Sequence, residues 1–284
     1  MASPAALTSN TWTTSPSPAR SRGGRSCSVA ARPRVYRAEG VVLRRRNLGE
    51  ADSILTVFSG SEGKFEAIAK GVRKARSRMR GHLEPLTRSR VLVAHGRSLD
   101  VFTQAETVDA YRRLREDLDA SAEALYCLEL VDRFTEEREP LPELYALLVN
   151  ALELLEGGKG ASVTRHFELR LLALLGYEPH IDGCVACGDR LPEEETLLSP
   201  SAGGLVCREC RPEAGGGRIV SVPVIKLLRF ARRATAAEFA AVGIPPEVQR
   251  ELRTAIAELV RYHLDRDPNA RRFVEGVSAL DKGE

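Results

Sequence analysis

The hydrophobic residues of this chain change their spacing near residue 110, and that change limits the folds available to it. Before this point, short runs of β-branched and apolar residues alternate with breaks that carry glycine or charge. After it, apolar residues recur every three or four positions, as in Leu118, Ala122, Leu125 and Leu128, which is typical of a helix with one buried face. Strands followed by helices predict an α+β chain with more than one domain.

The first region is predicted to be a small β-barrel or sandwich. Five short strands in so short a stretch are typical of either, and the five-stranded oligonucleotide-binding (OB) barrel is one candidate. The strand count alone does not choose between them. The expected strands cover residues 35–46, 51–59, 64–70, 88–94 and 99–107.

The second region is predicted to be helical. We expect a barrel domain over residues 34–110 and a helical domain over 111–284, with an insert at 180–218 where glycines and cysteines interrupt the helical pattern. No run of 18 apolar residues exists, so the sequence excludes a membrane-spanning helix. The expected helices cover residues 118–134, 144–155, 163–175, 223–241 and 246–264.

Residues 1–33 differ in composition from the rest of the sequence. They hold seven serines and no Asp or Glu, and they offer too little apolar surface to offset the entropy of ordering, so we expect a disordered extension. An organelle transit peptide is also compatible with an Arg- and Ser-rich segment that lacks acidic residues. A translation start placed too far upstream, with the true start near Val35, is the third interpretation.

Four of the six cysteines form two close pairs inside the insert, Cys184 with Cys187 and Cys207 with Cys210. Two residues between thiols let both sulfurs face one point about 2.3 Å away, as tetrahedral zinc requires. Two disulfides or a redox C-x-x-C motif are the competing interpretations. Four thiolates leave no open coordination position, so we expect one structural zinc ion per chain and no metal catalysis.

Positive charge is concentrated in the first region. Residues 1–110 carry 19 basic and 9 acidic side chains, whereas the remainder carries 23 and 30. A solvated surface is the plain interpretation of a charge run, but a block of one sign repels itself and favours an anionic partner such as a phosphate backbone. A second basic patch is Arg44-Arg45-Arg46. The main block has no acidic residue and comprises Lys70, Arg73, Lys74, Arg76, Arg78 and Arg80.

No pattern in the sequence indicates an enzyme. The P-loop, the dinucleotide-binding glycine motif, the G-x-S-x-G motif and the H-E-x-x-H motif are all absent from the sequence. Its carboxylate clusters have no metal partner, so cleavage of nucleic acid is a weak hypothesis. We therefore expect a binding protein.

Taken together, several short motifs resemble the family of the bacterial recombination mediator RecO. The resemblance covers about residues 34–280, and the order and spacing of the motifs make it specific. It rests on Gly40–Arg44, Gly49–Asp52, Gly63-Lys64, Ala69–Lys74 with Ser77, Gly176–Pro179 and the cysteines from Cys184 to Cys210.

The resemblance implies an N-terminal OB barrel joined to a helical domain that carries a zinc insert. It implies DNA repair and recombination through binding of single- and double-stranded DNA and annealing of complementary strands without ATP. It also implies binding of RecR and of the acidic tail of the single-stranded DNA-binding protein (SSB), and hence loading of RecA, in the cytoplasm at the nucleoid. The positions to which it assigns DNA contact are Lys70, Arg73, Lys74, Arg76 and Arg78, with Arg44 as a sixth.

A protein of another class is the alternative hypothesis. In it the chain is a zinc-stabilised adaptor whose helical domain recruits proteins, and its DNA binding is incidental.

Overall fold

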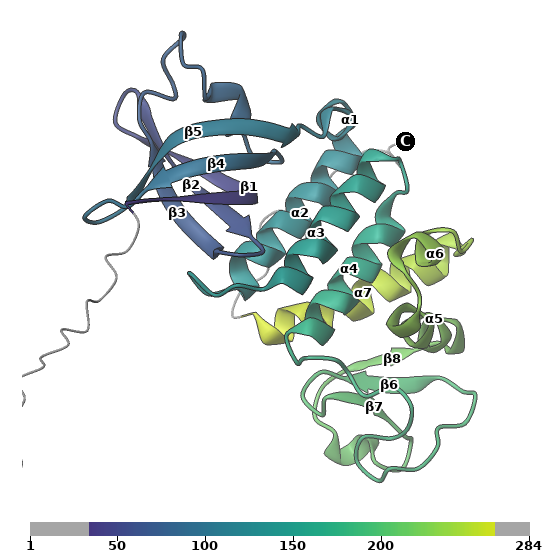
Figure 1. Cartoon of the computed structure of the whole chain (residues 1–284). Coiled ribbons are helices and arrows are strands. Elements are labelled where there is room, and N and C mark those ends of the chain that lie inside the picture. The colour runs from purple at the N-terminus through teal and green to yellow at the C-terminus, as the bar shows by residue number, and fades with distance from the viewer. Residues whose placement is uncertain (1–33, 265–284) are drawn as a thin grey trace, which may run out of the picture. The chain divides into compact units, whose positions relative to one another are not determined.

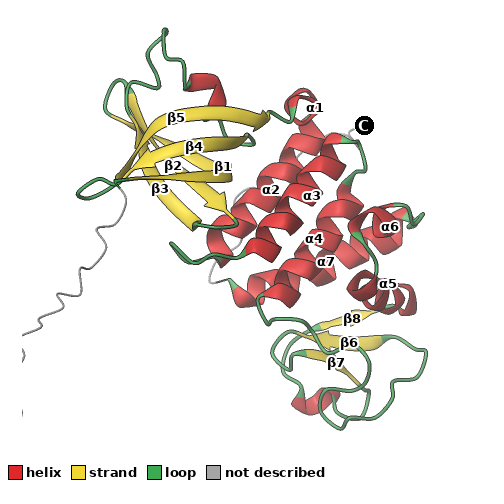
Figure 2. Ribbon diagram, viewed as in Figure 1, coloured by secondary structure: helices red, strands yellow, loops and turns green. Residues whose placement is uncertain are grey.

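The computed structural model describes residues 34–264, and its N-terminal part is a closed five-stranded barrel (Figures 1 and 2). The strands pair in the order β1-β2-β3-β5-β4, and β4 closes the ring on β1. All pairs are antiparallel except β3 and β5. The predicted OB-type barrel is confirmed. Its strands are β1 (Val35–Leu48), β2 (Asp52–Ser59), β3 (Gly63–Ala69), β4 (Arg88–Ala94) and β5 (Asp100–Asp109).

Alternation along the strands fills the barrel with apolar side chains. In β3 every second residue is buried, which places Phe65 inside and Lys64 and Glu66 outside. Phe65 and Phe102 are fully buried in this core, so neither can stack on a nucleic-acid base. Phe58 is also fully buried, but it belongs to the core of the helical part.

The helical part begins at Arg112, and two residues separate it from the last barrel strand. Four of the five predicted helices are present as single helices with small shifts of their ends, and a short helix, α1, precedes them. The helices are α1 (Arg112–Glu116), α2 (Leu118–Phe134), α3 (Pro142–Glu156), α4 (Ala161–Leu174), α5 (Val222–Arg233), α6 (Ala236–Ala240) and α7 (Pro246–His263).

The single helix expected over 223–241 was wrong, because the chain breaks after α5. Ala234 and Thr235 are extended, and Thr235 starts α6 through a capping box with Glu238. The threonine side chain accepts the backbone N–H of Glu238, whose carboxylate accepts the N–H of Thr235. Apolar spacing runs across this break, so periodicity alone does not reveal it.

The predicted insert contains a small sheet that the sequence analysis did not anticipate. Its strands are β6 (Thr196–Ser199), β7 (Gly204–Val206) and β8 (Arg218–Val220), in the order β7-β6-β8. Cys127 is fully buried on α2, as expected for a small core residue. Residues 1–33, with Cys27 and the three interpretations of that segment, lie outside the described residues.

The barrel and the helices share one hydrophobic core. Val41, Leu43 and Phe58 project from β1 and β2 into the helical cluster, where the ring centroids of Phe58 and Tyr145 are 6.2 Å apart. The outer face of β1 and β2 is therefore in contact with α2 and α3. Within residues 34–264, no helix is both long and apolar enough to cross a membrane.

Candidate nucleic-acid interface and metal centre

The basic segment forms the connection between β3 and β4 and is folded against the barrel. Val72 and Leu83 are fully buried in the barrel core, and Met79 packs against the same core. The arginine and lysine side chains between these three apolar anchors are exposed. The connection is therefore a shaped loop, which we call the basic loop (residues 70–83).

The turn between β1 and β2 holds the start of the basic loop. The Asp52 carboxylate accepts the N–H of Gly71 at 2.7 Å, and the Ala51 carbonyl accepts the N–H of Arg73 at 2.9 Å. The Arg73 guanidinium donates to the Gly49 carbonyl at 2.9 Å. Gly71 has a φ of +64°, a conformation that residues with a Cβ adopt at a cost. The Gly49–Asp52 motif thus supports the loop.

The cations of the basic loop face solvent. The side chains of Lys70, Arg73, Lys74, Arg76 and Arg78 are exposed. Within residues 34–264 none of these five forms an ion pair, although acidic residues are numerous in the chain. The predicted loop positions therefore lie together on one connection, and their charges are exposed and not paired with acidic groups within residues 34–264.

Arg44 is in a different situation. Its guanidinium lies 3.1 Å from Glu66 and 2.9 Å from Asp132, and Arg46 lies 2.8 Å from Glu66. Burial raises the pKa of Glu66, but the hydrogen bonds from Arg46 and Thr56 lower it more, so this carboxyl is held below its usual range. The structure therefore places Arg44 apart from the basic loop, beside two internal carboxylates.

The residues that create this difference are not evident from the sequence. Asp132 lies on α2, far from Arg44 in sequence, and it also accepts from Lys64 of β3. The alternation of β3 places Glu66 outside the barrel, which was the one available signal that Arg44 and Arg46 have an internal partner. Asp52 was noticed only as part of a motif, without a role.

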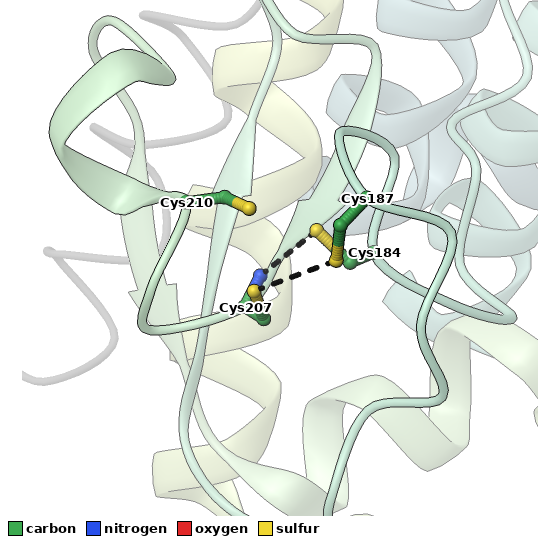
Figure 3. A group of neighbouring side chains, drawn as sticks. All are labelled: Cys184, Cys187, Cys207 and Cys210. Atoms are coloured by element: carbon green, nitrogen blue, oxygen red, sulfur yellow. Dashed lines mark hydrogen bonds between the residues drawn. The ribbon is translucent and has the colours of Figure 1, made fainter.

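The four insert cysteines converge on one point, as Figure 3 shows. Their sulfur atoms all lie within 4.8 Å of one another, and Cys187 Sγ is 3.9 Å from Cys207 Sγ. Ligands of tetrahedral zinc at 2.3 Å stand about 3.8 Å apart, far beyond the S–S bond of about 2.05 Å. Gly188 and Gly203, near the two pairs, have φ values of +81° and +82°, as expected for tight turns.

The pKa values of two of these thiols bear on whether they can bind a metal ion. Burial raises the pKa of Cys184, but backbone N–H groups of Cys187, Cys207 and Ala186 outweigh it and bring the pKa to about 6. A hydrogen bond with Cys207 raises the pKa of Cys210 to about 12. The lowered pKa of Cys184 favours its thiolate, which is the ligating form, and with the three thiols around it this residue forms a possible metal site.

Two family models match this chain. The one described as "Recombination protein O N terminal" matches residues 34–111, which contain the barrel. The one described as "Recombination protein O C terminal" matches residues 115–272, which contain the helices and the cysteine insert. Both the barrel with its basic loop and the four cysteines therefore fall inside matched regions.

Curated relatives are similar over most of their length. A protein of Roseiflexus sp. (strain RS-1) named "DNA repair protein RecO" is 36% identical over 253 residues, covering 88% of each chain. Its namesake from Pelotomaculum thermopropionicum is 36% identical over 250 residues, which are 88% of this chain and 97% of that protein. A third, from Dehalococcoides mccartyi (strain CBDB1), is 32% identical over 251 residues, 88% of this chain and 99% of that protein.

Proposed function

Since this chain belongs to the RecO family of DNA repair proteins, we propose that it binds single- and double-stranded DNA through the basic loop and anneals complementary strands without ATP. The proposal extends to recombination: with RecR, the protein helps to load RecA onto DNA coated by SSB. The helical domain contacts the SSB tail, and the protein works in the cytoplasm at the nucleoid.

The observation that carries this proposal is the set of five exposed loop cations without an internal ion pair among residues 34–264. Arginine and lysine side chains on a phosphate backbone release condensed counterions, which is the main source of affinity that does not depend on sequence. The apolar anchors at Val72 and Leu83 hold the loop in place before DNA arrives. Binding then costs little ordering entropy.

Annealing follows from charge neutralisation and needs no catalyst group. Two phosphate backbones repel each other, and a cationic surface lowers that repulsion while it leaves the base edges free. Pairing then proceeds downhill by a mean of about 1.4 kcal/mol per base step. We accordingly propose a binding protein and not an enzyme.

We propose zinc as the metal of the four-cysteine site. A set of four sulfur ligands in tetrahedral spacing favours zinc among the common metals, and it leaves no position for a substrate. The site then stabilises the insert beside the helices and takes no part in chemistry.

An annealing assay on complementary strands coated with SSB, without ATP, tests the function. The full chain is expected to accelerate annealing, and replacement of Arg73, Lys74 and Arg76 by Glu should abolish the acceleration. If the loop neutralises about five phosphates, a plot of log affinity for single strands against log salt concentration has a slope of roughly −3.5. For the variant, the slope should be roughly −1.4 or closer to zero.

The matched control reverses the charge of Arg112, Lys159 and Arg233, three exposed cations on the helical part. This variant has the same net charge as the loop variant, so unchanged DNA binding would exclude a general charge effect. DNA binding by the folded loop variant at the level of the unaltered protein would contradict the site. An affinity for DNA that depends on the helical part and not on the basic loop would favour the adaptor hypothesis.

A further inference from the structure

The face that OB barrels commonly use for oligonucleotides is partly covered in this chain. That face lies on strands 2 and 3. Here Phe58 of β2 packs near Tyr145 of α3, and Lys64 of β3 donates to the backbone carbonyl of Asp132 on α2. The helices therefore cover the part of this face that holds Phe58 and Lys64, and other surfaces of the barrel remain open to a nucleic acid.

A hollow of about 850 Å³ lies on the barrel where β1, β4 and β5 meet the second half of the basic loop, and Ser61 of the β2–β3 turn also lines it. Three arginines from three different elements line it: Arg37 from β1, Arg90 from β4 and Arg78 from the loop. Thr103 and Gln104 of β5 add side chains that form hydrogen bonds. Two carboxylates, Glu39 and Glu106, also line the hollow, so its lining combines three arginines and two acidic groups with hydrogen-bond donors and acceptors.

Ion pairs fix the position of one of the arginines that line this hollow. Glu39 accepts from Arg88 at 2.6 Å and from Arg90 at 3.0 Å, so it fixes one cation of the lining. The pKa of Glu39 is raised by burial but lowered more by these two arginines, so the carboxyl stays ionised. Arg37 and Arg78 are exposed and form no ion pair within residues 34–264. These two charges are available to a ligand.

The two ends of the basic loop lie at two different places on the barrel. Arg73 lies at the β1–β2 turn, where it donates to the Gly49 carbonyl. Arg78 instead lines the hollow beside Met79 and His82. His82 keeps this end in position, because its Nδ1 accepts the backbone N–H of Thr107 at 3.2 Å. The loop therefore divides its cations between the turn and the hollow.

We infer that the hollow is a second binding site for single-stranded nucleic acid, separate from the site at the Arg73 end of the loop. Phosphates bind Arg37 and Arg78, and Thr103 and Gln104 contact sugar or base edges. The inference rests on the proposed function, because a protein that anneals two strands gains from holding one strand at each site. Arg37 is the residue that distinguishes the sites, because it is far from Arg73 in the sequence and belongs to the hollow alone.

The test measures how many molecules of an oligothymidylate of about 12 nucleotides bind to the full chain, a length within the site size of one OB fold. The unaltered protein is expected to bind two. Arg37→Glu should bind one, with the affinity of the remaining site unchanged, and should anneal complementary strands at least tenfold more slowly. Arg37→Lys keeps the charge and should retain both sites.

Arg112→Glu is the matched control, because it makes the same charge change on an exposed arginine outside the barrel. The second site would be overturned if Arg37→Glu still binds two oligonucleotides. It would also be overturned if the unaltered protein and Arg37→Glu each bind one. Either result would leave the proposed role of the basic loop unchanged. If the unaltered protein binds none, the proposed function fails. Loss of both sites in Arg37→Glu and in Arg37→Lys would assign Arg37 to folding and also overturn the inference.

Discussion

At the scale of single residues, the ability of an arginine to bind a phosphate depends less on its position than on the groups around it. Arg44 and Arg73 are both exposed arginines on the barrel, yet Arg44 lies beside Glu66 and Asp132 while the Arg73 guanidinium donates to the backbone carbonyl of Gly49 in the β1–β2 turn. An arginine whose charge is already balanced gains less from a phosphate, because a new ion pair must replace an existing one. The basic loop, and not the Arg44 patch, is therefore the stronger candidate for contact with DNA.

Asp52 supports this contact without touching DNA in our proposal. Asp52→Ala removes the acceptor for the Gly71 N–H and should loosen the loop, which lowers DNA affinity about threefold to tenfold, or up to about 1.4 kcal/mol. Asp52→Asn retains an acceptor oxygen and should restore most of the affinity. Fluorescence anisotropy at constant salt measures both variants, and equal affinity for all three proteins would contradict the role.

Asp100 should make folding sensitive to acid. Burial raises its pKa, but hydrogen bonds from Tyr36, the Gly96 N–H and Arg138 lower it more, so the folded pKa lies below the ordinary value of 3.8. The stabilisation is therefore complete above that value and is lost as pH falls through the folded pKa. Urea unfolding of Asp100→Asn should differ from that of the unaltered protein at neutral pH and converge with it in acid. A difference that does not change with pH would contradict this assignment.

At the scale of elements, local patterns predicted most of the fold. Alternation gave the five barrel strands, and the predicted strand 88–94 agrees with β4 at both ends. The break between α5 and α6 was not predictable from periodicity, because Thr235 is a cap whose meaning depends on where the preceding helix stops. The pairing of Arg44 with Asp132 was also out of reach, since it depends on how α2 packs against the barrel. Local rules do not specify such distant contacts.

The cysteine insert is the element whose stability should depend on metal. Elemental analysis is expected to find close to one zinc per chain. Removal of the metal with a chelator should increase hydrogen exchange in β6, β7 and β8 and in the neighbouring α5, while the barrel keeps its affinity for DNA. A folded, metal-free protein with two disulfides would overturn the zinc assignment.

At the scale of the whole molecule, the barrel and the helices depend on each other. Phe58 and Val41 are buried only because α2 and α3 cover them, and Arg138, from the α2–α3 connection, lies over the rings of Tyr36 and Phe65 at 5.3 and 5.0 Å. Separating the two parts would expose this apolar surface to water. The free energy of the contact therefore couples the folding of the two parts.

This coupling predicts one cooperative unfolding transition for the barrel and the helical part. In urea, the loss of helical circular dichroism, measured at about 222 nm, should coincide with the loss of slow hydrogen exchange in β1 to β5, as two-state behaviour requires. Two separate midpoints would contradict the shared core. Tyr145→Ala, which removes the ring beside Phe58, should destabilise strands and helices by the same amount, about 3 kcal/mol.

The ring closure of the barrel also bears on how copies of this protein can contact one another. Open sheet edges invite pairing between chains and lead to aggregates. Each of the five barrel strands has a neighbour on both sides, although β3 and β5 pair only through Ala67–Asp100 and Ile68–Val101, and the outer strands of the small sheet, β7 and β8, are three residues long. Among the described residues, then, the short outer strands of the small sheet offer little template for intermolecular β-pairing, and closure confines the open edge of the barrel to the parts of β3 and β5 beyond their two paired residues.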